Sequence, residues 1–288
     1  MFTSRNIRDP GVMRKAGPRA FLAAAILAAW AIVLSVHAWR TAHVPSAERL
    51  ATAARSLPPG DSWYAIYRGR ERAGWARRQL DTLSGGRGFV LRERAVWEFR
   101  SLGDAARTET DLVAWLDAGI RLDSLVFRSM IGTDTSRLEL RAEGDTAIIL
   151  QPGGRRRVSD RPQLAGSWPL RFASDQAARR SGRSVSLVLF DPATALARET
   201  LLRVGESELR IWADSADTDP DTDEWISVRQ DTVRAWRIER VEGSLTLPVW
   251  VDEDGRVLEA EEPGGLRLER TAFELAFFSE PVTGEGTR

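Results

Sequence analysis

The chain has 288 residues, with 41 basic against 41 acidic side chains, two histidines and no cysteine. A net charge of zero argues against general nucleic-acid binding, which usually requires a basic excess. The missing cysteine excludes disulfides, thiolate metal sites, cysteine nucleophiles and a lipoprotein anchor. Both histidines, His37 and His43, lie near the N-terminus. The sequence therefore offers no histidine-based triad or metal site in the bulk of the chain, and we expect no catalytic residue, metal or cofactor.

The N-terminal residues have the composition of a membrane anchor. Residues 1–19 carry five basic side chains and one acidic side chain, and residues 20–39 carry no formally charged side chain. A helix over 20–39 is about 30 Å long, which matches the hydrocarbon core of a bilayer. The positive-inside rule places the basic stub in the cytoplasm and the rest of the chain outside it. Cleavage after Ala38, as in a signal peptide, is the alternative.

Residues 40–60 are expected to form a stalk that ends at a Pro-Pro-Gly sequence. From Asp61 onward, short β-type runs alternate with Gly- and Asp-containing turns. Phe89–Phe99 alternates most clearly, with Phe89, Leu91, Ala95 and Trp97 on one face, which is typical of a half-buried antiparallel strand.

Further strands are expected at 63–67, 74–83, 107–116, 120–130, 136–142, 146–151, 184–190, 201–204, 207–212, 225–229, 233–242, 246–251, 256–261 and 266–276. A loop is expected at 151–162, one helix at 168–181 and a flexible tail at 277–288. The predicted fold is a mainly antiparallel curved sheet or half-barrel over 61–276 with one covering helix. The sequence leaves open one domain or two similar halves, 61–151 and 184–276, joined by that helix.

Two short stretches suggest such halves. Trp115–Leu122 resembles Trp250–Leu258, and both are predicted to be hairpins with a tight Asp/Gly turn. The second stretch is interpreted as having one residue inserted in the turn. Two unrelated hairpins with common turn residues are the alternative interpretation.

The motifs that suggest chemistry are weak. The acidic run 214–224 lacks the glycine of a calcium-binding EF-hand loop and is interpreted as a solvated loop. The basic turn 153–157 is expected to be solvated, with contact to lipid phosphates as the alternative. The chain contains neither a GxSxG elbow nor a Walker A motif. We expect no enzyme activity, although a hydrolase that uses only carboxylates or serine stays open.

Nine tryptophans lie outside residues 20–39. Large aromatic side chains fill the concave side of a curved sheet or line a cavity for an apolar ligand. We expect core filling for most of them and take Trp97, Trp115, Trp236 and Trp250 as the candidates for a cavity lining.

Several stretches together resemble a known family. Trp63–Tyr67 with Ala73–Ala76, Phe190–Thr194, Trp250–Leu258 and Gly264–Ala276 are similar, in order, to the β-rich region that precedes the catalytic core in some bacterial exported transglutaminase-like proteins. The resemblance covers about 61–276. The cysteine–histidine–aspartate core of those proteins has no counterpart here, which implies the accessory domain without the enzyme. The expected fold is also similar to that of periplasmic lipoprotein carriers, an analogy that carries no functional weight by itself.

The leading functional hypothesis is a non-catalytic interaction domain in the inner membrane, with a separately encoded transglutaminase- or protease-like partner. The alternative is a carrier or sensor of a lipid or another hydrophobic ligand in a half-barrel.

Overall fold

A computed structural model describes Trp30 and residues 57–101, 104–158, 160–175, 179–222 and 224–277. The predicted basic stub, most of the predicted membrane helix and stalk, and the tail beyond Phe277 lie outside these residues. Within the described part, none of the helices combines the length and the apolar character that crossing a bilayer requires. The membrane helix at 20–39 therefore stays a prediction.

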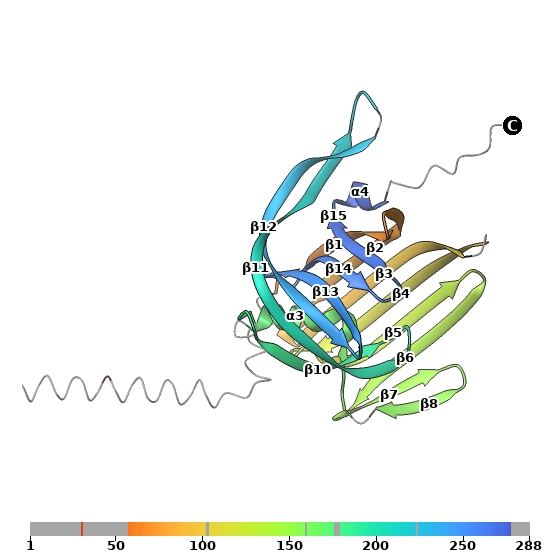
Figure 1. Cartoon of the computed structure of the whole chain (residues 1–288). Coiled ribbons are helices and arrows are strands. Elements are labelled where there is room, and N and C mark those ends of the chain that lie inside the picture. The colour runs from red at the N-terminus through yellow and green to blue at the C-terminus, as the bar shows by residue number, and fades with distance from the viewer. Residues whose placement is uncertain are drawn as a thin grey trace, which may run out of the picture. The chain divides into compact units, whose positions relative to one another are not determined.

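The described residues between Leu57 and Phe277 contain one large sheet of 15 strands (Figure 1). The first group is β1 (Gly60–Arg68), β2 (Glu71–Thr82), β3 (Gly88–Ser101), β4 (Asp104–Asp117), β5 (Leu122–Ile131), β6 (Asp134–Glu143), β7 (Thr146–Gln151) and β8 (Gly154–Val158). The second group is β9 (Gln163–Leu164), β10 (Ser184–Asp191), β11 (Leu196–Thr218), β12 (Trp225–Glu242), β13 (Leu245–Asp252), β14 (Val257–Glu262) and β15 (Leu266–Thr271). The helices are α3 (Trp168–Ser174) and α4 (Phe273–Phe277), with 3-10 turns at Ser84–Gly86 and Ala165–Ser167.

The order of the strands explains how the two groups join. The sheet runs β8-β7-β6-β5-β4-β3-β2-β1-β15-β14-β13-β12-β11-β10-β9, so β1 pairs with both β2 and β15. Neighbouring strands are antiparallel except for β9 and β10, which are parallel. The predicted mainly β fold is thus confirmed, and both predicted groups of strands belong to one continuous sheet.

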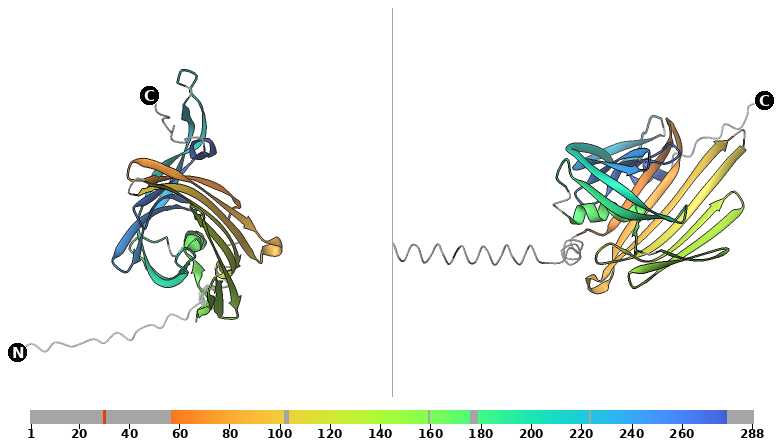
Figure 2. Two further views of the ribbon diagram at one scale, coloured as in Figure 1. Left: turned by 90° about the vertical axis from the view of Figure 1, so that its right-hand side faces the viewer. Right: turned by 60° about the horizontal axis from the view of Figure 1, so that its bottom comes forward.

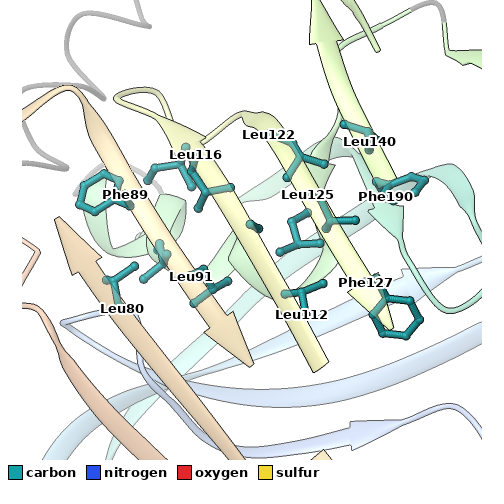
Figure 3. Packing of buried hydrophobic residues seen from close by; sticks show 14 of the residues in the cluster. Leu80, Phe89, Leu91, Leu112, Leu116, Leu122, Leu125, Phe127, Leu140 and Phe190 are labelled. Atoms are coloured by element: carbon teal, nitrogen blue, oxygen red, sulfur yellow. The ribbon is translucent and has the colours of Figure 1, made fainter. Parts of the chain in front are cut away.

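The sheet curls, so that its distant strands share a core. One buried cluster covers the inner faces of β2 to β7 and also includes Phe190 from β10 (Figure 3). A second cluster joins β1 and β2 to β10–β14. The guanidinium of Arg156 in β8 also donates to the carbonyl of Ala195, in the turn between β10 and β11. Because these contacts join opposite ends of the strand order, the sheet is barrel-like.

Helix α3 lies inside this curl (Figure 2, left). All of its residues except Arg171 are buried, because the curled sheet contacts the helix on several sides. The helix is thus an internal plug, and the expectation of a covering helix is corrected. Its predicted start at Trp168 is right and its predicted end at residue 181 is wrong. Asp175 adopts extended backbone, with φ −114° and ψ 92°, and ends the helix.

Three other predicted boundaries are also wrong. The expected loop at 151–162 contains β8, which pairs with β7 through the Arg-rich residues 155–157. The acidic run 214–224 begins inside β11, which continues to Thr218 and pairs with β12. The strand expected at 266–276 ends at Thr271 and is followed by α4. In the first two cases, backbone pairing with a neighbouring strand extends the sheet into a polar sequence. In the third case, a short helix replaces the end of the predicted strand.

The two hairpins that resemble each other in sequence have turns of the same length, with the same pattern of hydrogen bonds. Asp117 Oδ1 accepts from the N–H groups of Gly119 and Arg121. Asp252 Oδ1 accepts in the same way from residues 254 and 256. No residue is inserted, because Ile120 has the positive φ (63°) that Gly255 has (77°). The structural counterpart of Gly255 is therefore Ile120, and the predicted insertion is wrong.

Candidate functional site

A cavity of about 320 Å³ lies on the concave side of the sheet, where the two core clusters meet. It is lined from β1–β5 on one side and from β12–β15 on the other, and the segment 164–169, which includes the start of α3, forms part of its wall. Most of the wall is apolar, with side chains that include Ile66, Ala76, Ala95, Trp168 and Val249. Pockets of roughly 300–1,000 Å³ with apolar walls are typical of small-molecule sites, so this cavity is at the small end of that range.

Charged side chains interrupt the apolar wall at two places. The first is the ion pair between Arg78 Nε and Glu93 Oε1, at 2.6 Å. The two residues are direct cross-strand partners on β2 and β3, and their side chains are 23% and 29% exposed. Since alternate residues of a strand share a face, both point inward with Ala76 and Leu80. Burial lowers the pKa of Arg78, but the charge of Glu93, helped by Tyr64 and Glu262, outweighs burial and raises it overall.

The backbone of Gly166 lies directly over this pair. A Cβ atom at Gly166 would be 2.7 Å from Glu93 Oε1 and 3.1 Å from Arg78 Nη2. Such distances are shorter than ordinary van der Waals contact, so the turn Ala165–Ser167 packs closely against the ion pair.

The second charged place is centred on Arg240 of β12, which is 7% exposed. Its Nη2 lies 2.7 Å from Glu262 Oε2, and its Nε lies 3.0 Å from Glu242 Oε1. Burial lowers the pKa of Arg240, but Glu262 first, and then Glu242 and Asp191, raise it overall. Because Glu262 also acts on Arg78, the two charged places belong to one electrostatic network.

Tyr64 is the polar residue in the wall that lacks a partner. Its side chain is 2% exposed, and its hydroxyl has no hydrogen-bond partner among the described residues. A buried polar group left unpaired costs about 1–3 kcal/mol. Because the Tyr64 side chain lines the cavity, a ligand atom that reached this hydroxyl would supply the missing partner.

The four predicted lining tryptophans are placed differently from one another. Trp97 lines the cavity. Trp236 packs edge-to-face on Phe172 of α3, with ring centroids 5.9 Å apart, outside the lining. Trp115 and Trp250 alternate with buried core residues of β4 and β13 and so lie on the outer face. Trp250 stacks there beneath the guanidinium of Arg210, at 4.5 Å.

The charged and polar wall residues were missed by the sequence interpretation. Glu93 stands between Leu91 and Ala95 on the apolar face of the clearest strand, and Arg78 stands between Ala76 and Leu80 in the same way. A charge at an apolar position of an alternating strand is therefore the signal that would have found them.

The carboxylates of the wall are held by other groups. Glu93 and Glu262 face arginines, and Asp191 accepts from the Ala193 N–H and the Thr194 hydroxyl. In the part of the chain that the structure describes, no group of three or more Asp, Glu, His or Cys side chains has the arrangement of a metal site. The arrangement offers fixed charges and hydrogen-bond donors beside an apolar space.

Comparison with known proteins supports the fold alone. No family model matches the chain, and no curated protein matches it significantly. Among solved structures, the chain is similar to a β-barrel-like protein of the domain of unknown function DUF1849 from Brucella abortus. The TM-score is 0.51 and the identity 12%, over 75% of this chain and 95% of that one. A DUF1089 family protein from Pseudomonas aeruginosa matches with a TM-score of 0.38 and 15% identity, over 72% of this chain and 92% of that one. The chain thus shares a β-barrel-like architecture with the first of these proteins.

Proposed function

We propose that the protein binds a small, mainly apolar ligand in the cavity on the concave side of the sheet. The observation that carries the proposal is the unpaired hydroxyl of Tyr64, 2% exposed, on the wall of an apolar cavity of about 320 Å³. An apolar space with a few convergent polar groups is the usual form of a small-molecule site. The role is binding without catalysis, in a domain expected to lie outside the cytoplasm.

The volume of the cavity limits the size of the ligand. At about 320 Å³ the space suits one short chain or one compact ring system. A lipid with several acyl chains is too large to be enclosed. The proposal is therefore a carrier or sensor of small apolar molecules, distinct from a carrier of lipoproteins.

A variant that fills the cavity tests this function. Ala95 lines the cavity on β3, so Ala95→Phe places a ring in the ligand space. Ala213→Phe makes the same change on β11, outside the lining, and is the control. Equilibrium dialysis of methyl octanoate against the full-length protein should show binding that Ala95→Phe abolishes and the control retains. If both variants bind as the unmodified protein does, the ligand does not occupy this cavity.

A second candidate function, docking of a protein partner, is favoured by the hairpin arm formed by residues 207–234 of β11 and β12. In the described residues, these two segments pair only with each other in the sheet. Arg210 and Trp212 at the base of the arm pack on the outer face of β13–β15, and the rest of the arm extends beyond the sheet (Figure 1). Leu209 is 68% exposed, Ile211 65% and Val228 58%. Exposed apolar residues gathered on one element often mark an interaction surface.

We propose a transglutaminase- or protease-like protein as this partner, on the strength of the family resemblance of residues 61–276. A photo-crosslinking residue at Ile211, in cells that express the full chain, should capture such a protein. The same residue at Arg141 of β6, an exposed position outside the arm, is the control. Equal labelling at both positions, or no adduct at Ile211, would contradict docking through the arm.

A further inference from the structure

The cavity wall brings two hydrogen-bond donors to one place. Tyr64 pairs with Ala76 across β1 and β2, so Arg78, two residues farther along β2, is its diagonal neighbour on the same face. Tyr64 also acts on the pKa of Arg78. A guanidinium has five N–H donors, and the ion-pair contact with Glu93 is made by Nε. The hydroxyl of Tyr64, which has no hydrogen-bond partner among the described residues, and the terminal N–H groups of Arg78 are thus neighbouring donors on one face of the wall.

Each arginine of the cavity wall already faces an acidic side chain. Arg78 faces Glu93, and Arg240 faces Glu262. Asp191 adds a negative charge to the lining. An anionic ligand group would enter this wall without an uncompensated cation to receive it, and a buried charge without a partner is costly. An uncharged acceptor satisfies the same donors and brings no charge with it.

From these two features we infer that the ligand is an uncharged amphiphile whose polar end is a carbonyl-type acceptor, such as an ester or amide, held by Tyr64 and Arg78. The inference rests on the proposed binding function and specifies the ligand class for the same cavity. The apolar part of the ligand lies along Ala76, Ala95 and Val249 of the wall. Fatty-acid anions and phosphate-bearing lipids are excluded by the same reasoning.

Three probes of nearly equal chain length distinguish the outcomes. Methyl octanoate supplies an uncharged carbonyl, octanoate at pH 7 supplies a carboxylate, and nonane supplies no acceptor. Equilibrium dialysis against the full-length protein should show the ester bound at least about ten-fold more tightly than the carboxylate. Carboxylate binding equal to or tighter than ester binding would overturn the inference and leave the binding function standing. If none of the three binds, the proposed function itself fails.

Separate substitutions of the two tyrosines of the chain test whether the hydroxyl of Tyr64 donates a hydrogen bond to the ligand. Tyr64→Phe removes only the hydroxyl and should weaken ester binding by about three- to ten-fold, as expected for one hydrogen bond, with nonane binding unchanged. Tyr67→Phe is the matched control, because Tyr67 is outside the lining and packs against Arg267. The unliganded Tyr64→Phe protein should be no less stable than the unmodified one, because its hydroxyl has no partner to lose. Unchanged ester binding by a folded Tyr64→Phe protein would refute the role of this hydroxyl.

Discussion

The packing of α3 against the turn between β13 and β14 makes a sharp prediction about Gly255. This glycine has a φ of +77°. A Cβ atom at Gly255 would lie 2.7 Å from the carbonyl oxygen of Pro169 and 3.0 Å from both Ala173 Cβ and Leu170 Cα. Two of these three contacts are with helix backbone, which has no flexible side chain to move aside. We therefore expect Gly255→Ala to combine backbone strain with a clash.

Gly243 separates the two effects. It has a φ of +61°, and a Cβ atom there would have no neighbour within 4 Å. The left-handed backbone alone costs a non-glycine residue about 1–2 kcal/mol, so Gly243→Ala should lower the free energy of unfolding by about that amount. Overpacking of a core costs about 1–3 kcal/mol, so Gly255→Ala should lower it by about 2–5 kcal/mol.

Urea unfolding of both variants, followed by tryptophan fluorescence, measures the difference. We expect Gly255→Ala to lose more free energy of unfolding than Gly243→Ala, by at least about 1 kcal/mol. Because Pro169 also lines the cavity, binding of methyl octanoate should weaken in Gly255→Ala and remain in Gly243→Ala. Equal losses of stability in the two variants would show that α3 does not lie against this turn.

Three further predictions concern buried groups. Arg78→Met should destabilise the protein by about 2 kcal/mol or more, because it leaves Glu93 beside the cavity without its partner; Arg78→Met with Glu93→Met should cost less than the sum of the single changes in a double-mutant cycle. Burial raises the pKa of Asp252 above its ordinary value of 3.8, against the Arg256 N–H hydrogen bond and the charge of Arg270. The folded state therefore binds this proton more tightly, and the contribution of Asp252 to stability falls as the pH rises through 3.8 toward the folded pKa. Denaturation at a series of pH values should show the unmodified protein losing stability over that window relative to Asp252→Asn, and the opposite slope would contradict the direction of the shift. Ile120→Gly removes strain of about 1–2 kcal/mol but also a fully buried side chain whose loss costs about 2–5 kcal/mol; urea unfolding should therefore show a net loss, and a stabilised variant would contradict this balance.

The strands could be predicted from the sequence where one face is buried and the other is solvated. Phe89–Phe99 follows this rule and lies within β3. The rule fails where pairing continues without a core, as in β8 with its three arginines and in the β11–β12 arm. The end of α3 was also not predictable. Apolar residues at helical spacing suggested residue 181, but the extended backbone of Asp175 ends the helix.

The turns show how tertiary packing changes a local preference. A glycine is expected at a position of positive φ, and the predicted insertion in the second turn makes Gly119 the counterpart of Gly255. The structure instead places Ile120 there, fully buried in the cluster that includes Leu170 and Ala173 of α3. Burial of a large apolar side chain thus offsets the strain, and the equivalence of the two turns becomes visible only when the helix is in place.

The two ion pairs of the cavity differ in how much the sequence reveals. Arg78 and Glu93 are equally distant from Thr82 and Phe89, the last pair of their strands before the connecting turn. The short connection between the strands predicted at 74–83 and Phe89–Phe99 therefore sets their pairing, and two opposite charges on the apolar faces of one hairpin predict a buried pair. Arg240 and Glu262 lie on β12 and β14, with β13 between them. No single hairpin turn sets that distance, since it depends on two successive registers and on the curl of the sheet. Both ion pairs line the cavity. The position of its polar wall groups therefore depends on how the sheet curls as well as on the pattern of each strand.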